Sequence, residues 1–79
     1  MDRAELEAKV IELIEVAYGK EAGTVTVDSV FGEDLAGASV QMVALTAAIE
    51  NELDATLMLA DASACTTVSE LVDLVEEEM

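Results

Sequence analysis

Apolar residues recur at three- and four-residue steps in three parts of the chain, a spacing that places them on one face of an α-helix. The pattern predicts a helix from about Asp2 to Ala17, a second from Ser39 to about Leu53, and a third that opens at Thr67. The predicted inward stripes are Leu6, Val10, Leu13, Ile14 and Ala17; Met42, Leu45, Thr46, Ile49 and Leu53; and Val68, Leu71, Val72 and Val75.

Local signals mark the helix ends. Gly19 predicts the stop of the first helix, and Thr67-Val68-Ser69-Glu70 has the form of a capping box. Glu5 and Lys9 have the i, i+4 spacing of an ion pair. After the last helix we expect a solvated acidic tail, Glu76-Glu77-Glu78.

The segment from Gly19 to Ala38 has no helical periodicity. Thr24-Val25-Thr26-Val27 alternates like a strand, but no second strand exists to pair with it. We therefore expect a long loop in which Asp28-Ser29 caps a short turn. Its apolar anchors are predicted to be Val25, Val27, Val30, Phe31 and Leu35.

After the second helix, Leu57-Met58-Leu59 is predicted to return across the core, and Ala60 to Ala64 leaves room for only a helical turn or two. The predicted fold is all-α: an irregular four-helix bundle with three longer helices, one short helix and a long loop between the first two. With 79 residues, the chain is predicted to form a single domain over 1–79.

The charge is strongly one-sided, with 18 acidic against 3 basic residues and a net charge of −15. Hydrophobic residues make up 53% of the chain, enough for a core despite this charge. The sign argues against nucleic acid and anionic membrane as partners and favours basic protein surfaces, although the charge could serve solubility alone. No apolar run is long enough to span a bilayer, so we expect no membrane insertion.

The start, Met1-Asp2-Arg3-Ala4-Glu5, is too charged for a signal peptide. The one cysteine cannot make an internal disulfide. A reducing, cytoplasmic setting fits these features, and an organelle lumen reached by a removed transit peptide stays open.

No catalytic constellation is present, so we expect a protein that is not an enzyme. The chain has no histidine, and no basic residue near Ser39 in sequence could activate its hydroxyl. Cys65 has no lysine or histidine nearby to lower its pKa, which favours a small core residue over a nucleophile. A calcium-binding loop is not indicated either, because no segment has the required alternation of oxygen ligands.

Ser39 lies where a turn of small residues runs into the second predicted helix. A serine there is an ordinary helix cap, and on this residue alone that interpretation is favoured. The same position also suits an anion, because free N–H groups and the positive end of the helix dipole lie there.

The surrounding residues favour the second interpretation. The segment resembles the prosthetic-group site of acyl carrier proteins, F-x-E-D-L-G-A-D-S-L. The residues in register are Phe31, Glu33, Asp34, Leu35, Ser39 and Leu45. The likeness continues through Glu50, Glu52, Leu53 and Asp54 to Thr66-Thr67-Val68, and so covers essentially the whole chain.

The resemblance implies that a phosphopantetheinyl transferase attaches 4′-phosphopantetheine from coenzyme A to Ser39. The arm would carry acyl groups as thioesters between enzymes of fatty-acid, polyketide or related synthesis. We expect a monomer whose partner enzymes dock through basic or apolar patches. The residues predicted to bind partners are Glu33, Asp34, Val40, Gln41, Val43, Ala44, Ala47 and Glu50. Glu33 and Asp34 could equally be loop caps or help hold a transferase's magnesium ion.

Departures from the family pattern favour a specialised member. The aspartate before the modified serine is Ala38 here, and the leucine after it is Val40. Gln41 and Ala44 stand where early acids are usual. The alternative is a carrier-like adaptor that is never modified and docks partner proteins through its second helix.

Overall fold

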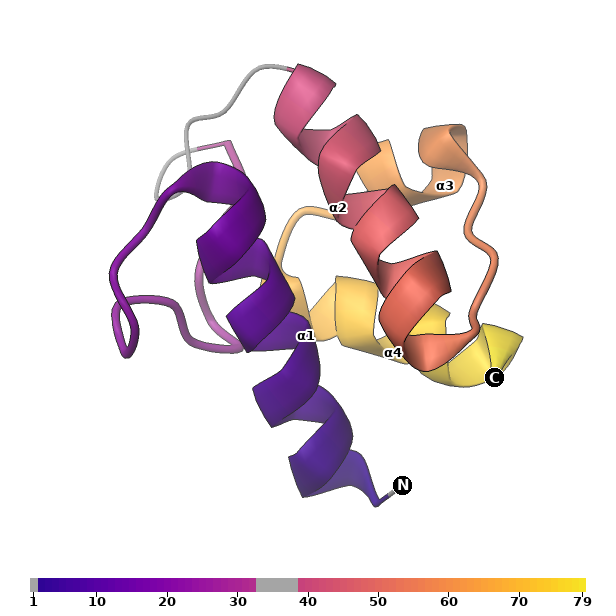
Figure 1. Cartoon of the computed structure of the whole chain (residues 1–79), viewed down its shortest axis with the longest axis horizontal. Helices are drawn as coiled ribbons and strands as arrows, with labels where there is room; N and C mark the ends of the chain where they lie inside the picture. The colour runs from indigo at the N-terminus through magenta and orange to yellow at the C-terminus, as the bar shows by residue number, and fades with distance from the viewer. Residues whose placement is uncertain (1, 33–38) are drawn as a thin grey trace.

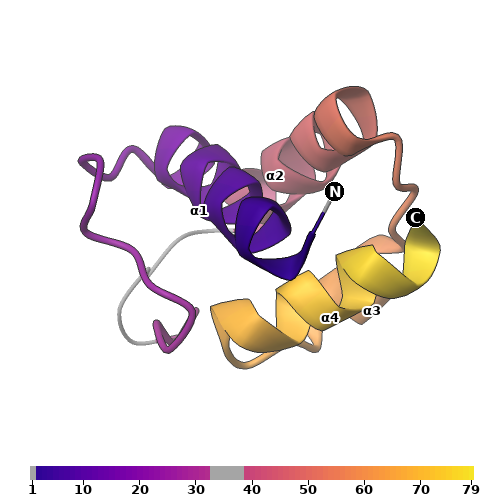
Figure 2. The ribbon, with the colours of Figure 1, turned by 90° about the horizontal axis from the view of Figure 1, so that it is seen from below.

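The residues that the structure describes form a bundle of four α-helices. A computed structural model describes residues 2–32 and 39–79, and at Ser39 it describes the main chain alone. The helices are α1 (Arg3–Tyr18), α2 (Ser39–Leu53), α3 (Leu59–Ser63) and α4 (Val68–Glu78) (Figure 1). In the turned view, α1 and α2 form one layer, and α4 and the short α3 form the other (Figure 2). The predicted all-α fold, with three longer helices and one short one, is confirmed.

The core lies where the apolar stripes of the helices meet. All the predicted stripe residues are buried except Ala17 and Thr46, which are half-buried. Ile14, Leu45, Ile49 and Leu71 are completely inaccessible to solvent. Burying each such side chain contributes roughly 1.5–3 kcal/mol before the entropy cost of ordering the chain.

The ends of α1 are set by its first and last neighbours. Asp2 is the N-cap rather than the first helical residue, and its carboxylate accepts a hydrogen bond of 2.8 Å from the N–H of Glu5. Gly19 ends the helix as predicted, with φ of +66°, a left-handed conformation that glycine adopts without strain. The N–H of Lys20 then donates to the Glu15 carbonyl at 2.8 Å.

The start of α4 confirms half of the predicted capping box. The Thr67 hydroxyl accepts from the N–H of Glu70 at 3.3 Å, as expected. The Glu70 carboxylate, however, accepts from the N–H of Thr66 at 3.5 Å, one residue before the cap. The predicted solvated tail is exposed but helical, because α4 continues to Glu78.

The loop after α1 is fastened to the start of α4. An isolated antiparallel bridge joins Val30 to Thr67. The N–H groups at the start of α4, which have no partner within the helix, are used here: Val68 donates to Ser29 O at 3.0 Å and Ser69 to Val27 O at 2.9 Å. This bridge is the only extended pairing within 2–32 and 39–79, so the predicted loop is confirmed over its described part.

The predicted loop anchors differ in depth. Val25 is buried, whereas Val27, Val30 and Phe31 are half-buried, and Leu35 lies outside the described residues. The predicted short turn is present. Its bond is made by the hydroxyl of Ser29, which accepts from the N–H of Thr26 at 3.0 Å.

The expectation that Leu57-Met58-Leu59 crosses the core is wrong. Met58 is 68% exposed and Leu59 43% exposed, while Leu57 is half-buried. The reason lies on either side: Asp54, at a positive φ of 57°, ends α2 and is followed by the buried Ala55. Ala62 of α3 is also fully buried. The fully buried residues of this part of the chain are therefore two alanines, and of the three larger residues only Leu57 packs against the core.

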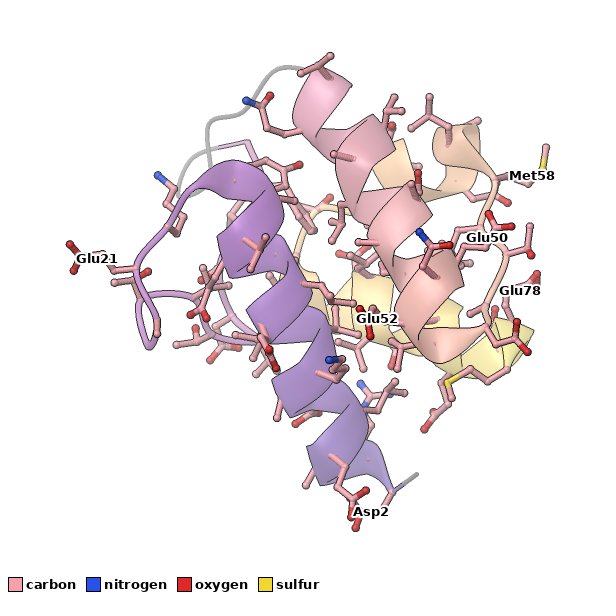
Figure 3. All side chains as sticks on the ribbon, in the orientation of Figure 1. Asp2, Glu21, Glu50, Glu52, Met58 and Glu78 are labelled. Atoms are coloured by element: carbon pink, nitrogen blue, oxygen red, sulfur yellow. The ribbon has the colours of Figure 1, made fainter. Side chains whose placement is uncertain are left out.

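The predicted Glu5–Lys9 ion pair is also wrong. The ammonium of Lys9 lies 3.8 Å from the carboxylate of Glu52 and 4.0 Å from that of Glu12. Glu52, at the end of α2, projects toward α1 (Figure 3). A partner on a neighbouring helix thus replaces the local one.

Candidate functional site

The first half of α2 carries the candidate site. Ser39 is the first helical residue of α2, so the predicted start of this helix is confirmed. Glu33, Asp34 and Leu35 of the predicted motif, and Ala38, which departs from that motif, lie outside the described residues. The described part of the site consists of α2 and the elements that pack against it.

The electrostatics at the start of α2 favour an anion. The first N–H groups of an α-helix have no partner within the helix and concentrate a partial positive charge. The first turn of α2 holds no acidic residue that would compete for these groups. A negative group at such a helix end is favoured by about 0.3–1 kcal/mol.

The outward side of the same helix segment is apolar. Val40 is 69% exposed and Val43 is 49% exposed. Ala44 and Ala47 are exposed beside them. These four residues, here called the apolar face of α2, lie before Glu50, the first charged residue along the helix. Glu50 is exposed and projects from the outer side of α2 (Figure 3).

Comparison with known proteins bears directly on this site. Residues 8–75 match the family model of the phosphopantetheine attachment site. The acyl carrier proteins of Rickettsia canadensis (strain McKiel) and Rickettsia rickettsii (strain Iowa) are each 35% identical over 72 residues, 91% of this chain and 84% of each relative. The chain belongs to the acyl carrier protein family. Its cofactor is 4′-phosphopantetheine, held covalently, and its role is that of a carrier.

The start of α2 fits the cofactor of this family. The attachment is a phosphodiester, which is an anion, and the first turn of α2, whose N–H groups have no partner within the helix, holds no acidic residue of its own. A hydroxyl at the first helical position would therefore hold the phosphate where the main chain can stabilise it.

Gln41, in the same turn, has an unusual environment. The residue is half-buried, and its Oε1 is enclosed yet accepts no hydrogen bond. It is the only buried side-chain oxygen or nitrogen without a partner that the described part of the chain contains. Such an atom costs about 1–3 kcal/mol, because it has lost water without gaining a donor.

Sequence reasoning missed the exposed residues after α2. Met58 and Leu59 add large apolar side chains to the surface, and Met58 projects outward on the same side of the view as Glu50 (Figure 3). A signal was available, because three consecutive large apolar residues in a short connection cannot all face one core.

Cys65 is a free, half-buried thiol between α3 and α4. It borders a shallow depression of about 340 Å³ whose lining includes Asp61, Glu70 and Asp73. Burial raises the pKa of the Cys65 thiol, and these three carboxylates raise it further. The thiol therefore stays protonated, which agrees with a packing role.

The described residues show no other centre of chemistry. No three potential ligands among His, Cys, Asp and Glu are placed to hold a metal ion in residues 2–32 and 39–79. Over the same residues, no helix has the length and apolar character needed to cross a membrane.

Proposed function

We propose that Ser39 is the attachment residue for 4′-phosphopantetheine and that the protein carries acyl groups for a specialised fatty-acid, polyketide or related pathway. The observation that carries this proposal is the start of α2 at Ser39, with an uncharged first turn, inside the region that matches the attachment-site family.

The attachment is a group transfer from coenzyme A by a phosphopantetheinyl transferase. The Ser39 oxygen forms a bond to the phosphorus that bears pantetheine, and the pyrophosphate P–O bond of coenzyme A breaks. Adenosine 3′,5′-bisphosphate leaves, and the hydroxyl proton passes to a base of the transferase. When bound, the group supplies a terminal thiol that holds an acyl chain as a thioester. The protein itself places the arm and is recognised by partner enzymes, and it contributes no catalysis.

Partner enzymes dock on the apolar face of α2, with Gln41 and Glu50 at its borders and Glu33 and Asp34 before it. The exposure of Val40 and Val43 supports apolar contact as the main contribution to the binding free energy of partner enzymes. The remaining acids favour partners with basic residues around an apolar centre. The single free cysteine fits a reducing, cytoplasmic setting.

Intact mass tests the attachment. The apo protein is incubated with coenzyme A, magnesium and a broad-specificity transferase, alongside Ser39→Ala and the matched control Ser63→Ala at the exposed end of α3. We expect the mass of one phosphopantetheine group on the wild type and on Ser63→Ala, and none on Ser39→Ala.

The second candidate is an adaptor that is never modified. It is favoured by the exposed apolar face of α2, which could bind a partner without any arm, and by Ala38 in place of the family aspartate. The same measurement separates the two candidates. Absence of added mass with every transferase, including that of the native host, would favour the adaptor.

A further inference from the structure

The enclosed oxygen of Gln41 has no structural explanation within the described part of the chain. An apolar side chain of the same length would fill the space without leaving an acceptor unpaired. A buried acceptor without a partner in one state of a protein has an explanation if a bound group supplies a hydrogen-bond donor to it in another state.

The position of Gln41 brings it close to Ser39. It lies two residues beyond Ser39, about 3 Å along the helix axis. Helical spacing places it on one side of α2 with Ala48 and Glu52. Ala48 packs against the core, and Glu52 pairs with Lys9 of α1 at 3.8 Å. Gln41 therefore stands at the end of α2 that begins with Ser39, on the side that faces α1.

We propose that Gln41 is a contact residue for the phosphopantetheine arm and that its side-chain amide forms a hydrogen bond with an amide of that arm. This inference rests on the proposed attachment at Ser39. A short branched chain that carries one hydroxyl separates the arm's first amide from the phosphate, so this amide is the amide group of the arm that lies nearest to the start of α2.

The chemistry holds for either placement of the glutamine oxygen and nitrogen. An amide of the arm offers both an N–H donor and a carbonyl acceptor. Gln41 can therefore accept with Oε1, or donate with its NH₂ group if the two ends are exchanged. The neighbours of Gln41 in the first turn of α2 are Val40, Met42 and Val43, whose side chains cannot form such a hydrogen bond.

The test compares apo and modified protein for the wild type, Gln41→Met and a control, Thr46→Val. Methionine keeps the length of the side chain and removes the amide. Thr46 is a half-buried polar residue of the same helix whose hydroxyl already donates to the Val43 carbonyl at 2.9 Å. Intact mass first establishes modification, and thermal unfolding then gives the shift on modification.

We expect modification to raise the melting temperature of the wild type by roughly 4–8 °C, the size of shift that a modest stabilisation causes in a domain of this length. Apo Gln41→Met should melt above apo wild type and gain nothing on modification. Thr46→Val should keep the wild-type gain. Gln41 is the only glutamine of the chain, so selective labelling should also show nuclear Overhauser contacts between its NH₂ group and the arm.

An equal gain in the wild type and Gln41→Met, or modified wild type without those contacts, would overturn the inference and leave the attachment intact. Absence of added mass would overturn both the attachment and this inference. The two failures are therefore distinguishable.

Discussion

At the scale of single residues, Glu15 shows what a sequence pattern leaves out. It lies on α1 among apolar residues and is only 8% exposed. Its carboxylate accepts from the N–H of Gly23 at 2.8 Å and of Val25 at 3.4 Å. These partners are main-chain groups of the following loop, and main-chain donors leave no mark in the sequence. Glu15 thus fastens the loop to α1.

Replacing Glu15 tests that role. Glu15→Ala should lower the free energy of unfolding by about 1–3 kcal/mol, because the two loop N–H groups lose their acceptor. Glu21→Ala, in the exposed loop, removes the same charge without removing a hydrogen bond from the carboxylate and is the matched control. Urea unfolding of both variants provides the measurement. Equal stability of Glu15→Ala and Glu21→Ala would contradict the role.

Cys65 gives a second prediction at this scale. Burial and nearby carboxylates raise the pKa of its thiol, so less thiolate is present at neutral pH than in the unfolded chain. The folded apo protein should therefore react with iodoacetamide more slowly than the same protein in denaturant. Because the folded-state pKa is the higher one, the associated stability is complete at low pH and declines as pH rises through the titration of this thiol. Equal alkylation rates for folded and unfolded protein would show that Cys65 is not protected.

Of the candidate site, the sequence supported the start of α2 at Ser39 and the exposed positions Val40 and Val43, because both depend on local periodicity and the motif. The enclosed state of the Gln41 oxygen could not be predicted. It depends on how side chains around the helix close over one atom, and the helical period alone places Gln41 at a border.

At the scale of elements, the helices follow from the repeat of apolar residues. The errors of the prediction are confined to helix ends and short connections. Helix α1 begins one residue later than predicted, because Asp2 is the N-cap and lies outside the helix. The connection after α2 was misplaced because Ala55 and Ala62, both small, were not recognised as core residues. Periodicity identifies long helices well, but it cannot decide which residues of a short connection are buried.

The apolar face of α2 leads to a prediction about docking. Apolar burial depends weakly on salt, whereas exposed ion pairs are screened beyond a Debye length of about 8 Å at physiological ionic strength. Val43→Asp should therefore weaken binding to the cognate partner more than Glu50→Gln does. Affinity of the wild type should fall only modestly from low to high salt. Titration calorimetry at two salt concentrations measures both effects.

A control on another helix sharpens this comparison. Val16 is 78% exposed on α1, so Val16→Asp adds the same charge to the surface at a residue outside the apolar face of α2. It should bind like the wild type. A steep loss of affinity with salt, together with a large effect of Glu50→Gln, would mean that the remaining acids direct recognition.

At the scale of the whole molecule, few cations hold many acids together. Arg3 pairs with Glu7 at 2.9 Å on its own helix, and with Asp73 at 2.7 Å and Glu76 at 3.2 Å on α4. Lys9 joins α1 to α2 through Glu52. Single surface pairs contribute little, about 0–1 kcal/mol each. These pairs cannot balance a net charge of −15, so repulsion should remain a term in the stability.

The size of the molecule decides how salt acts on that repulsion. Its longest dimension is 27 Å, while the Debye length is about 30 Å at 0.01 M salt and about 8 Å at 0.15 M. At low salt every acid therefore repels every other, and at physiological salt only neighbours do.

The melting temperature should rise with sodium chloride and then level off. Millimolar magnesium or calcium should raise it more steeply, because a surface of net charge −15 attracts divalent ions more strongly than monovalent ones. Scanning calorimetry at matched ionic strength separates screening from binding of divalent ions. Equal melting curves in sodium chloride and in the divalent salt would indicate screening alone. A melting temperature that responds to neither salt would mean that the fold already compensates the repulsion between its acids.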